Sequence, residues 1–393
     1  MVTVHRRTLF GGALALGGLG VLGLAGCANG SSSAQAGSAA IAKTIKITAV
    51  EDLTGAQAFA GVGSARGSEL AIEEINASGF LGAGVQLVFD KRDPAGEIER
   101  ATSEVTKAIA DKETMVLIGP ATGQQAAAVA PLAERGKVPI VFTQAGAEGV
   151  VIGDYTFRAT APMYTYYETA VEYLAENNVR TASILYNATF STLAELGTKH
   201  IPEMAAKHGI TIVSSVPVQS STQDFTTPTQ QITAASPDAV FIPILNNQAA
   251  TALKQFKQAG YRGKFMGNTA QAGGNMKEAG QDAVGIYYPV DFSAGQTDEA
   301  AKKFTAAFQA KFGELPKAYG AEGYDAIWWI ARGIKASGDS SREGIRKGLA
   351  QIAGQGFDGA MGAITFAGND MRVPGKVVQW DGEKETVVKI QGQ

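Results

Sequence analysis

Residues 115–143, MVLIGPATGQQAAAVAPLAERGKVPIVFT, predict a strand, a helix and a second strand. The runs MVLIG (115–119) and VPIVFT (138–143) are short and apolar, which is typical of buried strands. The alanine-rich residues between them, near 124–134, favour a helix. Because strands joined through a helix lie parallel in one sheet, this unit predicts an α/β fold with parallel strands.

The same alternation continues on both sides of this unit. Further strands are expected at residues 44–50, 85–93, 180–186, 211–218, 238–244, 263–268 and 285–290. Helices are expected after Pro162 and near 64–78, 96–111, 191–207, 224–235, 247–259, 297–312 and 319–336. The C-terminal tail favours short strands with a hairpin turn at Asp381-Gly382. The alternation runs twice, before and after about residue 160. We therefore expect two doubly wound parallel-sheet lobes with a ligand site in the cleft between them.

Composition and charge limit the possible functions. The chain has 393 residues, 45% of them apolar, so it can bury a substantial core. It contains 34 Lys and Arg and 37 Asp and Glu; removing residues 1–26 takes away only Arg6 and Arg7, which leaves 32 basic side chains. A slightly acidic chain lacks the clustered cations of a nucleic-acid-binding surface. A single cysteine excludes a disulfide framework and a cysteine-cluster metal site, and no cofactor is expected.

The N-terminus has the pattern of an export signal. Residues 1–26 combine a twin arginine with a glycine-diluted apolar run that is short for a membrane-spanning helix. LAGC (24–27) resembles the lipobox of bacterial lipoproteins, which implies cleavage before Cys27 and lipidation of its sulfur. Residues 27–43 are mostly small and polar, so they are expected to form a flexible tether.

Signals for catalysis are scarce. His200 and His208 are expected at the surface, and His5 is removed with the signal. The sequence contains neither a G-x-S-x-G elbow nor a Walker A motif. The segment GVGSARG (61–67) lacks the dinucleotide fingerprint and is expected to be a loop that leads into a helix. We therefore expect no enzymatic activity.

Two strands end in small or polar residues that suit a ligand. PATGQQ (120–125) and QAGAEG (144–149) follow the strands at 115–119 and 138–143. Glycine and alanine allow close approach to the backbone, and a helix that begins near Gly123 would direct free N–H groups at a carboxylate or carbonyl. The alternative is that both segments are ordinary strand-to-helix turns.

Five segments together resemble type I periplasmic binding proteins of the branched-chain amino acid (leucine/isoleucine/valine) group. They are residues 53–79, 116–141, 157–162, 318–338 and 357–370. The resemblance implies two lobes joined by a three-segment hinge that close on a ligand. It places lobe 1 at residues 44–160 and 290–366, and lobe 2 at residues 161–289 and 367–393.

The resemblance also implies which residues bind the ligand. They are Phe59, Thr122, Gly123, Gln124, Ala145, Gly146 and Ala147 in lobe 1, and Tyr164, Phe190, Asn246 and Thr269 in lobe 2. Amino-acid binders of this family usually have serine and threonine at the positions of Gly123 and Ala147. They often have acidic residues at the positions of Tyr164 and Thr269. A buried ammonium without a carboxylate is costly, so the ligand is expected not to be a standard α-amino acid. An aromatic acid, which would stack on aromatic rings, and a small amide both remain open.

Three functions fit such a chain. The first is a lipid-anchored receptor on the outer face of the cytoplasmic membrane that delivers a small solute to the permease and ATPase subunits of an ABC importer. The second is the ectodomain of a sensory receptor, which the sequence does not separate from the first. The third, an extracellular hydrolase, is disfavoured because a nucleophile–base motif is missing.

Overall fold

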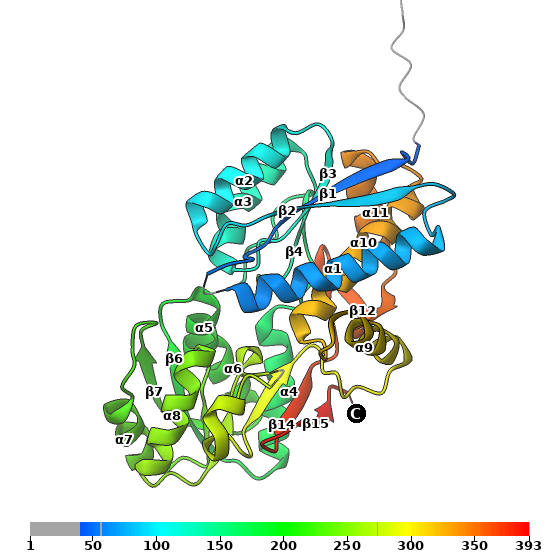
Figure 1. Ribbon diagram of the computed structural model, residues 1–393. Helices are drawn as coiled ribbons and strands as arrows, with labels where there is room; N and C mark the ends of the chain where they lie inside the picture. Colours follow the sequence, from blue (N-terminus) through cyan, green and yellow to red (C-terminus); the bar gives the residue numbers. More distant parts are fainter. Residues whose placement is uncertain (1–39, 56, 273, 393) are drawn as a thin grey trace, which may run out of the picture. The chain divides into compact units, whose positions relative to one another are not determined.

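The computed structural model describes residues 40–392 except 56 and 273. The expected signal segment, Cys27 and most of the expected tether lie outside the described residues. Within the described part, no helix has both the length and the apolar character needed to cross a membrane. The described chain folds around two sheets, each covered by helices on both faces (Figure 1).

The first sheet contains eight strands in the order β11-β12-β13-β5-β4-β3-β1-β2. Their bounds are β1 (Thr44–Val50), β2 (Gln86–Arg92), β3 (Thr114–Ile118), β4 (Ile140–Phe142), β5 (Thr156–Arg158), β11 (Phe357–Gly359), β12 (Gly362–Ala367) and β13 (Asp370–Arg372). Strands β1 to β5 are parallel, whereas β11 and β12 pair antiparallel with each other and β12 pairs antiparallel with β13. The expected unit at residues 115–143 is therefore confirmed as β3, a helix and β4.

The second sheet contains seven strands in the order β15-β14-β10-β9-β8-β6-β7. Their bounds are β6 (Thr181–Asn187), β7 (Thr211–Val218), β8 (Ala239–Phe241), β9 (Lys264–Met266), β10 (Tyr287–Val290), β14 (Lys376–Trp380) and β15 (Glu385–Ile390). Strand β14 pairs antiparallel with both β10 and β15, and the other pairs are parallel. Asp381 accepts backbone N–H bonds from Glu383 and Lys384, both at 2.9 Å, which confirms the expected hairpin turn.

The helices occupy the intervals between the strands. They are α1 (Ala58–Ser78), α2 (Ile98–Ala110), α3 (Gly123–Gly136), α4 (Met163–Glu176), α5 (Ser191–Glu195), α6 (Ile201–Lys207), α7 (Thr226–Ala234), α8 (Asn246–Gln258), α9 (Glu299–Phe312), α10 (Ala318–Ser337) and α11 (Arg342–Ala353). A π-helical turn, Leu196–His200, joins α5 to α6, and two 3-10 segments cover Thr269–Gln271 and Lys277–Asp282. Helix α11 is not among the helices expected from the sequence.

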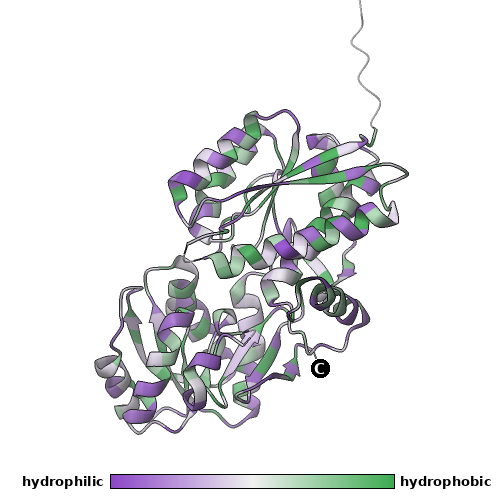
Figure 2. Ribbon diagram, viewed as in Figure 1, coloured by the Kyte–Doolittle hydropathy of each residue, from purple (hydrophilic) through white to green (hydrophobic). Residues whose placement is uncertain are grey.

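Each sheet buries both faces because side chains alternate along its strands. In β3, Leu117 packs into the layer with α2 and α3, whereas Val116 and Ile118 pack into the layer with α1 and α10. The helices turn apolar stripes toward the sheets and polar residues outward (Figure 2). The expected stripe on α9 is confirmed as core, because Phe304 and Phe308 are buried.

The chain passes between the two sheets three times, within residues 159–162, 291–298 and 373–375. The third passage comes later than the boundary expected after residue 366, because β13 still pairs with β5 of the first sheet. The two lobes are thus built from interleaved parts of the chain.

The glycine-rich segment 61–67 lies inside α1, so the expectation that it forms a loop is wrong. A Cβ at Gly67 would lie 1.9 Å from the carbonyl oxygen of Gly320 in α10. A Cβ at Gly323 would lie 2.1 Å from the carbonyl oxygen of Ser64. The glycines therefore allow the backbones of α1 and α10 to approach closely, and this packing outweighs the weak helix propensity of glycine.

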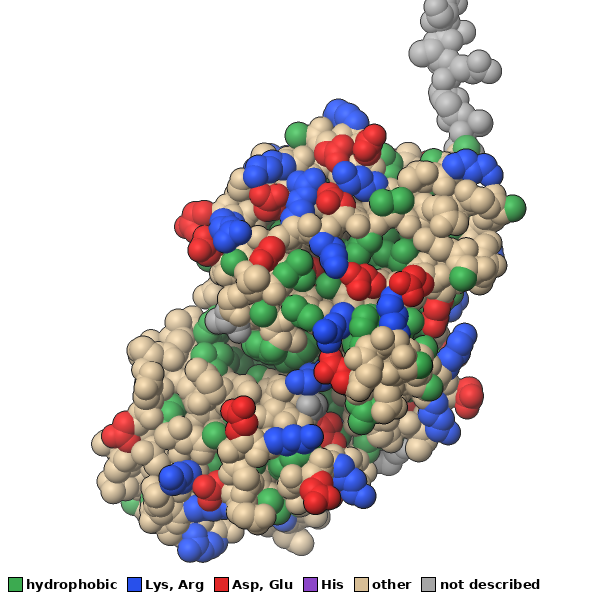
Figure 3. Space-filling view, in the orientation of Figure 1, with side chains coloured by type: hydrophobic (Ala, Val, Ile, Leu, Met, Phe, Trp, Pro, Cys, Tyr) green, Lys and Arg blue, Asp and Glu red, His purple; other side chains and the backbone are tan. Residues whose placement is uncertain are grey.

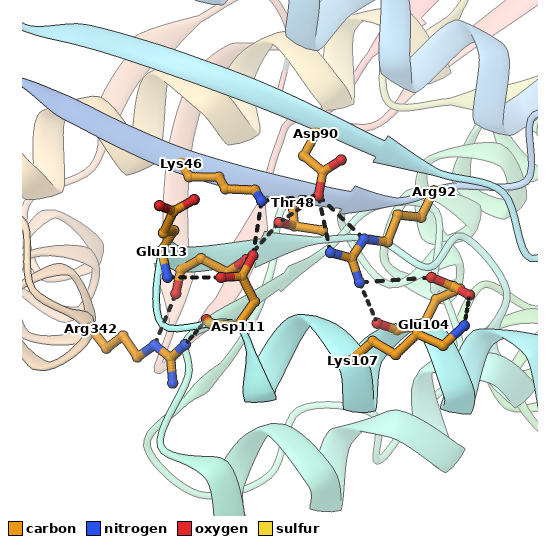
Figure 4. Close-up of polar contacts among 10 residues, drawn as sticks. Lys46, Thr48, Asp90, Arg92, Glu104, Lys107, Asp111, Glu113 and Arg342 are labelled. Carbon is orange, nitrogen blue, oxygen red and sulfur yellow. Dashed lines mark hydrogen bonds and ion pairs between the residues drawn. The ribbon is translucent and has the colours of Figure 1, made fainter.

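A network of charged residues joins β1, β2 and α11 of lobe 1 (Figure 4). The Lys46 ammonium lies 3.6 Å from a carboxylate oxygen of Asp90 and 2.8 Å from one of Asp111. The Arg342 guanidinium donates to the backbone carbonyl oxygens of Asp111 and Thr114. The hydrogen bond from Lys46 lowers the pKa of Asp111 to about 2, so this carboxylate stays ionised at neutral pH.

Candidate functional site

A cavity of about 120 Å³ lies between the lobes, at the carboxyl ends of the parallel strands. Figure 3 shows apolar side chains in the hollow between the two lobes. Lobe 1 and α10 contribute Gln57, Phe59, Ala60, Ala121, Thr122, Gly123, Gln144 and Tyr319. Lobe 2 contributes Met163, Phe190, Thr192, Leu193, Leu245, Asn268, Thr269 and Ala270. Larger hollows elsewhere on the surface lie away from the carboxyl ends of β1, β3 and β4, and the inter-lobe cavity therefore has the better position for a ligand.

Five of the expected site residues line this cavity: Phe59, Thr122, Gly123, Phe190 and Thr269. The ring of Phe59 meets that of Tyr319 edge-on, with centroids 5.5 Å apart. Phe190 lies on the opposite lobe and precedes α5. A planar group between the lobes would therefore meet aromatic rings from both sides.

The other six expected residues lie beside the cavity and do not line it. They are Gln124, Ala145, Gly146, Ala147, Tyr164 and Asn246. Four of them directly follow a residue that lines the wall. Gln124 follows Gly123, Ala145 follows Gln144, Tyr164 follows Met163, and Asn246 follows Leu245. The Gln124 amide instead donates to the carbonyl oxygen of Thr189 in the other lobe, at 3.4 Å.

Tyr164 stacks on His200 beside the cavity, with ring centroids 4.5 Å apart. His200 is only 5% exposed, so the expectation that it is a surface residue is wrong. The aromatic stack and its place at the junction of α5 and α6 bury the imidazole, and this burial lowers its pKa. Glu148 of lobe 1 lies 3.8 Å from the imidazole and 2.8 Å from the Lys199 ammonium. These contacts join the two lobes beside the cavity.

Arg158 supports the loop that follows β4; it lies in the segment 157–162 that resembles the family but is not among the expected site residues. Its guanidinium pairs with both carboxylate oxygens of Asp370, at 2.8 Å each. It also donates to the carbonyl oxygens of Ala145 and Ala147. These two residues therefore shape the wall through their backbone, while Gln144 itself lines the cavity.

No Asp, Glu, Lys or Arg of the described chain lines the cavity. Two carboxyl groups lie behind its wall. Glu322 accepts the backbone N–H of Gln144 at 3.1 Å, and burial together with neighbouring Asp291 raises the pKa of Glu322 well above its usual range. Burial likewise raises the pKa of the Glu51 carboxyl to about 8. Burial therefore disfavours the ionised form of both groups, and no carboxylate of the described chain stands in the cavity wall itself to pair with a bound ammonium.

Several polar side chains of the wall are already used within the protein. The Asn268 amide donates to the carbonyl oxygen of Ile244 at 2.9 Å and accepts from the backbone N–H of Ala270 at 2.8 Å. Thr122 caps α3 by accepting the backbone N–H of Gln125 at 3.2 Å. The Gln57 amide and the Thr192 and Tyr319 hydroxyls make no hydrogen bond within the part of the chain that the structure describes. These three groups can therefore form hydrogen bonds to a ligand without breaking a hydrogen bond within the protein.

Two long helices begin at the cavity, one from each lobe. Helix α3 begins at Gly123 in lobe 1, and α8 of lobe 2 begins at Asn246, directly after the cavity residue Leu245. Their first turns carry backbone N–H groups without intrahelical partners and the positive end of the helix dipole. The cavity therefore favours a ligand with a carboxylate or carbonyl oxygen. Among residues 40–55, 57–272 and 274–392, no cluster of three His, Cys, Asp or Glu could hold a metal ion.

Comparison with known proteins agrees with this architecture. Residues 44–384 match the family described as periplasmic binding protein. The Leu/Ile/Val-binding protein homolog 7 of Brucella abortus is 24% identical over 381 residues, which cover 90% of this chain and 93% of that protein.

Two solved structures illustrate the shared fold. The leucine-binding protein LivK of Thermotoga maritima has a TM-score of 0.80 at 22% identity, and the match covers 88% of this chain and 98% of that one. An ABC-transporter solute-binding protein of Rhodopseudomonas palustris BisB5, in complex with 3,4-dihydroxybenzoic acid, has a TM-score of 0.77 at 22% identity. That match covers 88% of this chain and 96% of the other.

Proposed function

Since the chain belongs to the type I periplasmic binding proteins of the branched-chain amino acid family, we propose that it is the extracytoplasmic solute-binding protein of an ABC importer. The observation that carries this proposal is a cavity between two lobes whose wall combines aromatic rings, uncharged polar groups and helix N-termini. Solute binding would bridge the lobes and favour the closed arrangement by its higher affinity for that state. The permease would then recognise the two lobes together.

The ligand is an organic acid, or an amide, that lacks an ammonium group. The helix N-termini stabilise a carboxylate, and the rings of Phe59, Phe190 and Tyr319 suit a flat body. An α-amino acid would bring a positive charge, and no carboxylate of the described chain lines the cavity to pair with it. Placing an unpaired ammonium in such a site costs several kcal/mol.

Calorimetry with benzoate, 3,4-dihydroxybenzoate, benzamide, leucine and isoleucine tests this ligand class. We expect an aromatic carboxylate or amide to bind at least about 100-fold more tightly than leucine, since about 2.7 kcal/mol separates affinities by that factor. Phe190→Ala should weaken the best ligand about tenfold by removing one aromatic wall. Val213→Ala, on the exposed edge strand β7, is the matched control and should bind as the parent does. Micromolar binding of leucine would refute the proposed ligand class and leave the transport role intact.

We also propose that Cys27 anchors the protein to the outer face of the cytoplasmic membrane. The proposal rests on the LAGC sequence at 24–27 and the small polar residues after it. When the gene is expressed in a bacterium with lipoprotein processing, most of the parent protein should sediment with membranes. The parent and Ser31→Ala should incorporate a labelled fatty acid, whereas Cys27→Ser, which lacks the thiol, should not. Equal labelling of the parent and Cys27→Ser would exclude a lipid anchor at this residue.

A further inference from the structure

A second cavity, of about 190 Å³, lies entirely within lobe 1, between α9, α10 and β11. Its wall includes Lys303 of α9, Asp325, Trp328 and Arg332 of α10, and Phe357 and Asp358 of β11. None of these residues lines the inter-lobe cavity. Because all three elements belong to one lobe, the shape of this cavity does not depend on how the lobes close.

The Arg332 guanidinium is positioned by two aromatic rings. Its central carbon lies 5.7 Å from the ring centroid of Trp328 and 5.1 Å from that of Phe357. It forms no ion pair with a carboxylate of the described chain, and its Nε is buried without a hydrogen-bond acceptor. A guanidinium has five N–H donors, and a buried donor without a partner is unfavourable. The two rings and the burial of Nε leave the two terminal nitrogens of the guanidinium as the donors that an acceptor can reach.

The other charges of the wall limit what the acceptor can be. Lys303 also has no ion-pair partner among the described residues. The Asp325 carboxyl accepts the backbone N–H groups of Ala360 at 2.8 Å and Met361 at 2.9 Å, and burial raises its pKa to about 7. Asp358 is exposed at the wall. Two cations therefore face two acidic residues, which suits an anion with a single charge and disfavours a phosphate dianion.

We propose that this cavity is a binding site for one small monocarboxylate. The carboxylate accepts two parallel N–H bonds from the two terminal nitrogens of Arg332, which, unlike Nε, are not buried. Its short apolar part packs against Trp328 and Phe357. The Lys303 ammonium adds a positive charge near the carboxylate but does not fix the orientation of the carboxylate. This site is separate from the proposed solute site and would be occupied in both the open and the closed arrangement of the lobes.

Trp328 supplies the signal for a test with sodium acetate. Of the three tryptophans, Trp329 and Trp380 are almost fully buried, at 0% and 2% exposure, while Trp328 lines the cavity. At pH 7.5 and constant ionic strength, acetate should change the tryptophan fluorescence of the full chain with a saturable curve that chloride does not produce. Arg332→Lys keeps the charge but loses the paired donors, so it should weaken acetate at least tenfold. Asp358→Asn should strengthen acetate a few-fold, because it removes a nearby negative charge.

Two variants serve as controls. Lys335, one turn further along α10, stacks on Phe80 at 4.1 Å, and Lys335→Met should leave the acetate curve unchanged. Phe190→Ala alters the inter-lobe cavity and should also leave the acetate curve unchanged. Circular dichroism melts establish that each variant folds. A response that does not saturate, that persists in Arg332→Lys at full strength, or that disappears in Phe190→Ala would overturn the proposal. Stronger binding of phosphate than of acetate would also overturn it, since the wall would then accept a dianion.

Discussion

Replacing Gly67 by alanine is expected to lower the free energy of unfolding by about 3 kcal/mol or more. The added methyl group would sit 1.9 Å from the carbonyl oxygen of Gly320 and 3.0 Å from the backbone nitrogen of Tyr324. Both are backbone atoms, so no side chain can rotate away, and α1 and α10 must separate. Alanine favours a helix by about 1 kcal/mol relative to glycine, which offsets only part of this cost.

Urea unfolding followed by circular dichroism measures this effect. Gly354→Ala is the matched control, because Gly354 has helical backbone angles and its nearest neighbour would lie 3.5 Å from the new methyl group. The control should change the free energy of unfolding by no more than about 0.5 kcal/mol. Phe59 lies on α1 and Tyr319 lies on α10, so a larger distance between these helices in Gly67→Ala should also weaken solute binding. Unchanged stability in Gly67→Ala would mean that the helices are not in close contact in solution.

The contact between α1 and α10 shows where sequence patterns predict the structure and where they do not. Short apolar runs predict most parallel strands of both sheets, because buried parallel strands need an apolar side chain on each face, but they miss the three-residue strand β5. The pattern places the start of α1 too late, at 64 instead of Ala58, because glycines at 61, 63 and 67 lower local helix propensity. Gly63 and Gly67 face α10, far along the chain, and Gly61 lies against the backbone of Asp52, so no local pattern contains the reason for these glycines. Helix α11 does carry a local signal: Ser341 caps it, and Ile345, Leu349 and Ile352 share one face.

The site is predictable in outline and not in detail. The strand-end turns are predicted to lie near a cleft because parallel strands end at one edge of a sheet, whereas Phe59, Phe190 and Thr269 are implied by the family resemblance. Which neighbour in each turn faces the cavity depends on backbone angles, as at Gln144, whose φ of 55° lies in the left-handed region. Tyr319 reaches the cavity from α10, and its contribution requires knowledge of the tertiary contact with α1. Arg158 supports the wall by donating to the backbone carbonyl groups of Ala145 and Ala147, and such contacts cannot be predicted from side-chain patterns in a sequence.

Glu51→Gln is expected to make the protein more stable at alkaline pH and to have little effect near pH 4.5. Glu51 is 1% exposed, and its Oε1 accepts from the hydroxyls of Ser64 and Thr143, both at 2.9 Å, while Oε2 has no partner among the described residues. Burial raises the pKa of this carboxyl in the folded protein from 4.5 to about 8. Glutamine keeps the shape and the acceptor oxygen but does not ionise.

The direction of the pH effect follows from proton binding. Below pH 4.5 the carboxyl is protonated in both the folded and the unfolded chain, so its titration does not change stability. Between pH 4.5 and 8 the unfolded chain releases the proton while the folded chain retains it, and the free energy of unfolding falls by about 1.4 kcal/mol per pH unit. The loss ends above pH 8, where the folded protein also ionises. Glutamine avoids this loss, so the variant should exceed the parent by about 4 kcal/mol at about pH 8.5.

Urea unfolding of both proteins from about pH 4.5 to about pH 9 measures this difference. Other buried acids, such as Glu322 and Asp325, titrate equally in the two proteins, so their contributions cancel when the two free energies are subtracted. Glu113→Gln changes an exposed glutamate and should follow the parent at every pH. A difference between Glu51→Gln and the parent that stays constant with pH would show that Glu51 is ionised in the folded protein. In that case the wall behind Gln144 would carry a negative charge, and the argument against an ammonium-bearing solute would lose one of its two supports.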